Sequence, residues 1–446
     1  MSVLLQRNLA ALNRGVSFSK LSFIRKNSSA VPNQSDDLPV HEYGVGSAGD
    51  RKLYVWGLVE HGGLGVHHLL KKKKFPPQYY QRPSSHNLAH LCKISDIACG
   101  YGFSLFAVKK DKVRLLGCGI STDGQIGYQA PRRNHPLGMV QTASPIQLPI
   151  ADDTKVIRVA AGRAHSLVLT DSQGLFTLGN NAYGQCARAV VPGEDYASVN
   201  NLYNVKHLGG QRIVDVCCGQ DHSLMLTEDG GVWACGWGAD GQTGQGHFEA
   251  SVAQPRAVAT GDVAGERIVK VASKGDFVLA LNDKGEVFGW GNNEYKQIVA
   301  ADILQINTPV HLKQLQQVAG RIVDIGAGGS FAIAVNECGS VFVWGFGLLG
   351  GGPQLTRAGA PQRLPATLFG GGEGEGEVQQ VGCGLFCMSA VTRLGHLYMW
   401  GRNKGASLGL GHTNDQYFPF KVAVGAEVLK VATGVDHTLA LCKPFA

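Results

Sequence analysis

Acidic, basic and imidazole side chains recur within the three residues that follow a glycine. The residues that share this setting are Arg163, His165, Asp221, His222, Asp276, Asp436 and His437. Such groups can move protons in catalysis or attract the charged groups of a partner. The chain lacks GxSxG, HExxH and a Walker loop, and no nucleophile stands beside a base. We therefore expect no bond-making active site, and a hydrolase or lyase stays only as a third class.

Two other patterns suggest ligands but have simpler explanations. The glycine-rich run 241–246 could cradle a phosphate, but no Lys-Ser/Thr pair follows it, and it is in register with Gly124-Gln125 and Gly184-Gln185. We interpret it as a repeated turn. The eleven cysteines are odd in number and form no CxxC pair, so neither a disulfide framework nor a zinc site is expected. We expect no metal and no cofactor.

A basic and aromatic segment offers a second kind of chemistry. Lysines and arginines beside tyrosines can contact a phosphate backbone and stack on bases. The residues in question are Lys71, Lys72, Lys73, Lys74, Tyr79, Tyr80 and Arg82. The alternative is a solvated charged loop, which is what four consecutive lysines usually form. The segment is a candidate RNA-contact loop.

Repeats position these residues. Loop positions 100, 162, 219, 274, 328 and 384 are each followed, 17 residues later, by a glycine that ends an aromatic-rich strand. These glycines are Gly117, Gly179, Gly236, Gly291, Gly345 and Gly401. Apolar runs with a period of two lie between the two positions, which predicts paired strands rather than a helical repeat. The 61 glycines and the low charged fraction of 17% fit many short strands joined by turns.

The seventh repeat, around Gly434, ends at Ala446 before its aromatic strand. A strand of the missing type lies at the other end of the chain, at residues 53–57. Borrowing that strand closes a ring and removes free sheet edges. We therefore predict an all-β fold, a seven-bladed β-propeller closed by an N-terminal strand that pairs with the last blade.

Three further positions of the repeat can be explained by packing. Cys99, Cys218 and Cys383 occupy a place that other repeats give to Ala, Ser or Thr, which predicts a small buried side chain. The histidine position holds Phe in three repeats, so burial is the alternative explanation for its histidines. The Trp-Gly steps at 56, 290, 344 and 400 predict contacts between blades.

The N-terminal region has a different composition. Residues 1–35 hold five basic residues, seven serines and no acid, and Leu5, Leu9, Leu12 and Val16 fall on one helical face opposite Arg7 and Arg14. This is typical of a mitochondrial transit peptide, with a disordered basic tail as the alternative. We predict a transit peptide at 1–35, a linker at 36–50 and the propeller at 51–446. The formal charge of the whole chain is +7. From Asp36 onward 36 basic residues face 34 acidic ones, so the remaining chain is nearly neutral.

The loop Cys218–Ser223, the 17-residue step and the Trp-Gly strand ends resemble the regulator of chromosome condensation repeat family. The resemblance covers about residues 50–446. Stretches 235–244 and 414–419, with the leader, are similar to the mitochondrial exchange-factor-like branch of that family. Several family members are guanine-nucleotide exchange factors built as seven-bladed propellers. Segment 188–196 lies where a family exchange factor carries a wedge, and matches it poorly.

The resemblance implies a function and partners. The Asp, His and Arg residues named first would line a GTPase-binding face that promotes GDP release. The expected GTPase is the dynamin-like GTPase of inner-membrane fusion, and the expected location is the matrix or the matrix side of the inner membrane. The alternative is an RNA-binding scaffold for assembly of the large mitochondrial ribosomal subunit, without exchange activity.

Overall fold

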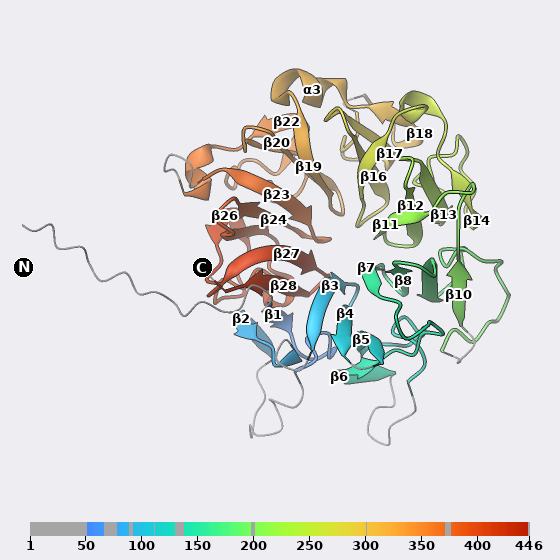
Figure 1. Cartoon of the computed structure of the whole chain (residues 1–446). Coiled ribbons are helices and arrows are strands. Elements are labelled where there is room, and N and C mark those ends of the chain that lie inside the picture. Colours follow the sequence, from blue (N-terminus) through green and yellow to red (C-terminus); the bar gives the residue numbers. More distant parts are fainter. Residues whose placement is uncertain are drawn as a thin grey trace, which may run out of the picture. The chain divides into compact units, whose positions relative to one another are not determined.

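The computed structural model describes residues 51–66, 78–88, 92–110, 112–129, 138–197, 201–299, 301–370 and 376–444. The predicted leader and linker lie outside these residues. Within them, strands form seven four-stranded antiparallel sheets, the blades of a propeller (Figure 1). No described helix has the length and apolar character that crossing a bilayer requires.

The first four blades follow the chain in order. Blade 1 is β3 (Lys93–Cys99), β4 (Phe103–Lys110), β5 (Val113–Ile120) and β6 (Met139–Pro145). Blade 2 is β7 (Val156–Ala161), β8 (His165–Thr170), β9 (Leu175–Gly179) and β10 (Leu202–Val205). Blade 3 is β11 (Ile213–Cys218), β12 (His222–Thr227), β13 (Val232–Gly236) and β14 (Val252–Ala257). Blade 4 is β15 (Ile268–Ala272), β16 (Phe277–Asn282), β17 (Val287–Asn292) and β18 (Gln305–His311).

The remaining blades complete the ring. Blade 5 is β19 (Ile322–Ala327), β20 (Phe331–Asn336), β21 (Val341–Phe346) and β22 (Arg357–Arg363). Blade 6 is β23 (Val378–Cys383), β24 (Cys387–Thr392), β25 (Leu397–Gly401) and β26 (Gln416–Lys421). Blade 7 joins β27 (Glu427–Thr433) and β28 (His437–Lys443) to β1 (Lys52–Leu58) and β2 (Tyr79–Ser85). Short helical segments lie between strands: η1 (Gly261–Val263), α3 (Lys313–Ala319), η2 (Ala366–Phe369) and η3 (Lys404–Ala406).

Blade 7 confirms the predicted closure. β1 pairs with β28 from Lys52 opposite Cys442 to Gly57 opposite His437. The first strand of each blade lies next to the central axis and the fourth lies outside (Figure 1). β27 contacts β3 of blade 1, so the inner strands close around the axis.

The strand-end glycines allow the hairpin to pack against the loop before it. Gly179, Gly236, Gly291, Gly345 and Gly401 each pair with the first residue of the preceding strand. In blade 1 the prediction of Gly117 is wrong. Phe103 pairs with Gly119, whose φ is 102° and where a Cβ would approach the Gly102 carbonyl oxygen to 2.2 Å. The β4–β5 hairpin is two residues longer, which moves the equivalent glycine to 19 residues after Gly100.

The tryptophans of the Trp-Gly steps join neighbouring blades, as predicted. All four are buried. The indole N–H groups of Trp56, Trp290 and Trp344 donate to the carbonyl oxygens of Ser407, Gln242 and Gln297 in the preceding blade, at 2.7, 3.0 and 2.8 Å. Each bond satisfies a buried donor and fixes one blade against the next.

Candidate functional site

The loops between the first and second strands of the blades meet at one end of the axis. They are joined across blades by backbone hydrogen bonds from Arg163 to Gln220, from Gln220 to Gly275, from Gly275 to Gly328 and from Gly329 to Leu385. Five blades are thereby linked at the mouth of the ring. We call this end the loop face.

Arg163 and Asp221 form a two-point ion pair on the loop face. Nε of Arg163 donates to Oδ1 of Asp221 at 3.0 Å, and Nη2 lies 2.7 Å from Oδ2. Asp221 is 7% exposed, whereas the Arg163 side chain is 46% exposed. Burial raises the pKa of Asp221, and the Arg163 guanidinium partly offsets this. The exposed guanidinium and its buried acid together present a fixed positive group beside the mouth.

Asp276 lies close to this pair but has no cation of its own. Its nearest polar contact is the Gln242 amide, with Nε2 at 3.5 Å from Oδ1. Burial raises the pKa of Asp276 to about 6, and the carboxylates of Asp240 and Asp221 add to the shift. Among the described residues no Lys or Arg nitrogen lies within ion-pair distance of Asp276. An arriving cation would therefore stabilise its charged form.

A pocket of about 290 Å³ adjoins Asp276. Its apolar lining comes from blades 5 and 6 and consists of Phe331, Phe346, Leu348, Leu385 and Phe386. Arg402 also lines it. Phe346 is 39% exposed, and the Lys404 ammonium lies over the Phe386 ring at 5.1 Å from its centroid. Half-exposed aromatic side chains beside a desolvated charge are the composition of an interaction hot spot.

Sequence reasoning missed the aromatic part of the loop face. Tyr183 packs edge-on against Trp237 at 4.7 Å, and Tyr295 stacks on Phe346 at 4.9 Å between ring centroids. Each pair joins a residue four positions after one strand-end glycine to a residue one position after the next such glycine. This repeated spacing is the feature of the sequence from which the two aromatic pairs could have been predicted.

His165 and His222 lie below the loop face, with no exposed surface. Their Nε2 atoms lie 3.0 Å from Oγ of Ser223 and 3.1 Å from Oγ of Ser273, each in the next blade. Burial lowers the pKa of both to about 3, so both rings are neutral. These contacts favour the packing interpretation, and a role of the two histidines in partner binding stays a prediction.

His437 has a different environment, between blades 7 and 1. Its Nδ1 lies 2.9 Å from Oδ1 of Asp436, and its Nε2 lies 2.9 Å from Oγ of Ser104. Ser104 donates its own hydrogen to the Gly63 carbonyl oxygen at 2.7 Å, so both ring nitrogens of His437 can donate. Burial alone lowers the pKa of His437, but the Cys99 sulfur and the Asp436 carboxylate outweigh it and raise it to about 10.

Asp436 is held by two histidines. Its second oxygen, Oδ2, lies 2.8 Å from Nδ1 of His61, which follows β1. Burial raises the pKa of Asp436, but the two histidine contacts outweigh it and hold it well below the ordinary value. Although Ser104, His437 and Asp436 follow the order of a hydrolase triad, Ser104 is fully buried and its hydrogen points away from the histidine. The cluster joins the two ends of the ring.

Lys274 stands where six other repeats have glycine, and its side chain crosses the axis. From blade 4, its ammonium donates to the carbonyl oxygen of Cys99 in blade 1 at 2.7 Å and to that of Ala161 in blade 2 at 3.4 Å. Burial lowers its pKa. The lysine links three blades below the loop face.

Lys274→Met should therefore destabilise the ring, because it leaves both carbonyl groups without their donor. We expect the free energy of unfolding in urea to fall by about 1–3 kcal/mol. Lys284→Met, which removes only an exposed pair with Glu266, should change the free energy of unfolding much less, because water can replace that contact. Equal losses in the two variants would contradict a bridging role for Lys274.

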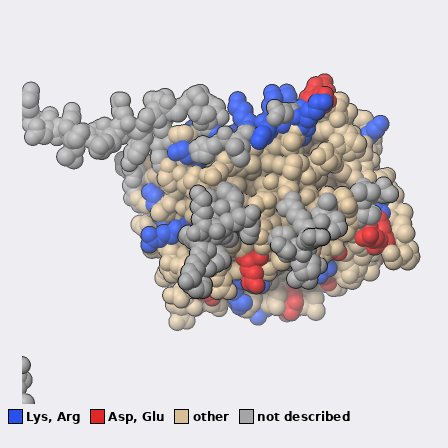
Figure 2. All heavy atoms as spheres, turned by 90° about the horizontal axis from the view of Figure 1, so that it is seen from below, with Lys and Arg blue, Asp and Glu red and all other residues tan. Residues whose placement is uncertain are grey.

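The candidate RNA-contact segment is described only in part. Lys71, Lys72, Lys73 and Lys74 lie outside the described residues. Tyr79, Tyr80 and Arg82 lie on the outer strand β2, the tyrosines half-buried and Arg82 exposed. Figure 2 shows a largely uncharged side of the molecule on which basic residues gather along one edge. RNA contact by this segment stays a prediction.

Contacts within and next to segment 188–196, the place of the family's wedge, hold this segment in position. Arg188 donates to Glu194 from Nη1 at 2.9 Å and to the Asn201 side-chain oxygen from Nη2 at 2.7 Å. The Arg188 and Glu194 side chains are only 15% and 18% exposed. The Arg188 guanidinium therefore stabilises the conformation of this segment.

The closed propeller thus carries an acid, an arginine and an aromatic pocket on its loop face. Residues 191–444 match the RCC1-like domain, and residues 156–185 match the regulator of chromosome condensation (RCC1) repeat. The chain belongs to this repeat family.

Relatives of the whole chain are known. Over 92% of this chain it is 42% identical to the mouse RCC1-like G exchanging factor-like protein, covering 91% of that protein. The human protein of the same name is 40% identical over 92% of this chain and 90% of its own length. The crystal structure of human WBSCR16 is 40% identical and superposes with a TM-score of 0.82, covering 89% of this chain and 100% of that one. The fold and family predictions are confirmed.

Proposed function

We propose that this protein is an exchange-factor-like propeller of mitochondria that binds a GTPase through its loop face and promotes GDP release. An exchange factor acts by binding the nucleotide-free GTPase more tightly than the loaded form. It needs a rigid surface with groups that compete for the cations that hold the nucleotide. The GTPase implied by the family resemblance is the dynamin-like GTPase of inner-membrane fusion.

Asp276 beside the aromatic pocket carries the proposal. A carboxyl group without a cationic partner favours a lysine or arginine supplied from outside, and the pocket offers apolar area to hold the surrounding segment. The interblade hydrogen bonds keep these groups in place, so little order must be gained on binding. The exchanging-factor-like names of the mouse and human relatives support the same class of activity.

The mitochondrial location is part of the proposal. It rests on the acid-free, Arg- and Ser-containing composition of residues 1–35. The proposed working place is the matrix or the matrix side of the inner membrane.

Exchange is tested with the purified propeller and the GTPase loaded with fluorescent GDP. The unmodified protein should accelerate GDP release, and Asp276→Asn should reduce the acceleration at least about tenfold, because a charge-assisted contact in a desolvated site is lost. Phe346→Ala should weaken binding through lost apolar contact. Asp283→Asn, at the other end of β16, is the matched control and should leave exchange unchanged.

Circular dichroism and urea unfolding would establish that each variant is folded. Absence of acceleration by the unmodified protein would overturn exchange activity. Equal release rates for Asp276→Asn and the unmodified protein would remove Asp276 from the interface.

A further inference from the structure

At the opposite end of the propeller, where the second and third strands of a blade turn, a repeated bond connects neighbouring blades at three joints. The amide N–H of Ile268 donates to the Gly230 carbonyl oxygen at 3.1 Å. The same bond joins Ile322 to Gly285 at 3.0 Å and Val428 to Gly395 at 3.0 Å. In each case the first strand of one blade caps the hairpin turn of the blade before it.

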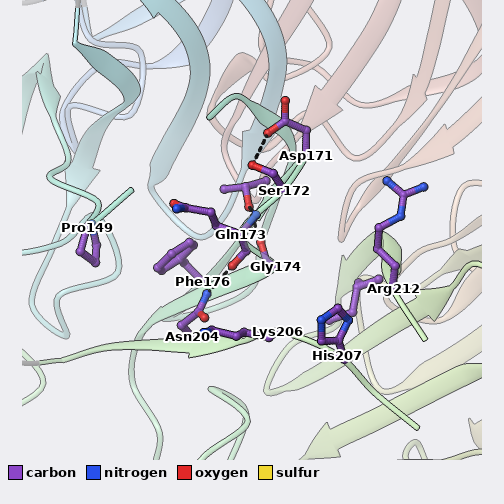
Figure 3. A pocket seen from close by; sticks show the side chains of 12 residues that line it. Pro149, Asp171, Ser172, Gln173, Gly174, Phe176, Asn204, Lys206, His207 and Arg212 are labelled. Carbon is purple, nitrogen blue, oxygen red and sulfur yellow. Dashed lines mark hydrogen bonds between the residues drawn. The ribbon is translucent and has the colours of Figure 1, made fainter. Parts of the chain in front are cut away.

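The joint between blades 2 and 3 lacks this bond, as does the joint between blades 5 and 6, where Val378 and Gly339 are the equivalent residues. Between blades 2 and 3 the equivalent residues are Ile213 and Gln173, and no bond between them is found; the Gln173 carbonyl oxygen accepts from the Asn204 side chain instead. Gly174 packs against the end of β10, where a Cβ would approach the Val205 carbonyl oxygen to 2.5 Å. Residues 206–212 then run between blades 2 and 3, and a pocket of about 400 Å³ opens there (Figure 3). Pockets of this volume hold small molecules.

An arginine that lines this pocket is only partly engaged. Arg212, Arg267 and Arg321 occupy one repeat position, seven residues before the loop position. Arg321 donates to the Asp283 and Lys284 carbonyl oxygens of the preceding turn, each at 2.8 Å. Arg212 makes no such bonds to any described residue. Its Nη2 contacts Glu228 at 3.3 Å, and both side chains are more than half exposed. A guanidinium has five N–H donors, so this contact leaves most of them unused.

Two further basic side chains line the same pocket. Lys206 and His207 are exposed, and no hydrogen bond or ion pair of their side chains is found within the described part of the chain. Figure 3 shows His207 next to Arg212, facing the turn formed by Asp171 to Gly174. Arg212, Lys206 and His207 all come from the segment 206–212 that lines this pocket.

The rest of the pocket lining is rigid. Asn204 donates from Nδ2 to the Gln173 carbonyl oxygen at 2.9 Å, and Thr170 donates from Oγ1 to that of Gly174 at 2.7 Å. The Gln173 side-chain oxygen accepts the Ala151 N–H at 3.1 Å, which orients its amide nitrogen as a donor. The carboxylate that lines the pocket, Asp171, already accepts from the Lys155 N–H at 3.0 Å and from Ser172 at 3.2 Å. Buried Phe176 and Ile213 supply apolar lining.

We propose that this pocket binds the phosphate group of a small soluble organic phosphate. Arg212, Lys206 and His207 would hold the phosphate, since guanidinium and ammonium groups are its usual ligands. The Gln173 amide and the apolar lining would contact the organic part. The pocket lies at the far end of β8 from Arg163, so its ligand would bind independently of a partner on the loop face.

Calorimetric titration of the propeller with inorganic pyrophosphate and with ribose 5-phosphate tests the proposal. Both should bind at one site per chain, and Arg212→Gln or Lys206→Gln should weaken binding at least about tenfold, the loss expected for one charge-assisted contact. Arg267→Gln is the matched control, because it occupies the same repeat position at a joint where the repeated bond is formed. It should bind like the unmodified protein.

Three results would overturn the proposal: no saturable binding of either probe at millimolar concentration, equal weakening by Arg267→Gln, or retention by phosphatidic acid vesicles without binding of the soluble probes. Exchange measured with the same Arg212→Gln protein should be unchanged, which separates this site from the loop face.

Discussion

Asp436→Asn should lower the free energy of unfolding by about 3–5 kcal/mol, the usual cost of removing one partner from a buried ion pair. The side chain keeps its shape but loses the charge that balances His437. Its amide can no longer accept from both His437 and His61. Because this carboxylate lies where the last blade meets the first, the loss should appear as unfolding of the whole ring in urea.

Asp221→Asn is the matched control, because Asp221 occupies the same repeat position in blade 3. Its partner Arg163 is half exposed, and water can replace the lost contact. We expect a cost of about 1 kcal/mol, typical of exposed pairs. If the two substitutions cost the same, the Asp436 cluster stabilises the closed ring no more than a half-exposed ion pair does.

The stability of the propeller should fall between pH 7 and pH 10 because of His437. Its pKa is raised from 6.5 to about 10 in the folded protein. The stabilisation is therefore fully present below pH 6.5 and is lost as the pH rises through 10. A fully buried group with such a shift changes stability by a few kcal/mol. Asp436 has a lowered pKa, so its contribution is present above pH 3.8 and lost in acid.

Urea unfolding at several pH values, with two variants, tests this. His437→Phe should remove most of the alkaline loss, since other blades carry Phe at this position. His222→Phe should leave the alkaline side unchanged. The pKa of His222 is lowered to about 3, so its destabilising effect occurs as the pH falls from 6.5 towards 3. An alkaline loss that persists in His437→Phe would exclude His437 as its source.

The sequence was sufficient to predict the propeller because the repeat carries its geometry in fixed offsets. Gly57, Gly179 and Gly291 take the same place in three blades, and the missing strand of the seventh repeat was visible at residues 53–57. Gly119 shows the limit of counting. The β4–β5 hairpin is two residues longer than the others, so Gly119 takes the strand-end position in blade 1. Gly117 lies at the predicted spacing of 17 residues only by coincidence of sequence.

The site was less predictable because its contacts come from other blades. Asp221-His222 and Asp436-His437 are the same dipeptide, yet Asp221 turns to Arg163 while Asp436 turns to its own histidine. The two histidines consequently shift their pKa in opposite directions. The pocket beside Asp276 likewise combines residues of four blades. The spacing of residues along the chain does not show which side chains of different blades contact each other.

The pairing of β1 with β28 also sets an order of events during synthesis. Lys52 leaves the ribosome nearly 400 residues before its partner Cys442. The intervening blades are local antiparallel units and can form early, whereas joining the two ends closes a very long loop and comes last. Until then β1 and β28 each lack a neighbour and expose an unpaired edge. A chaperone that shields the newly made chain would be needed most at these two strands.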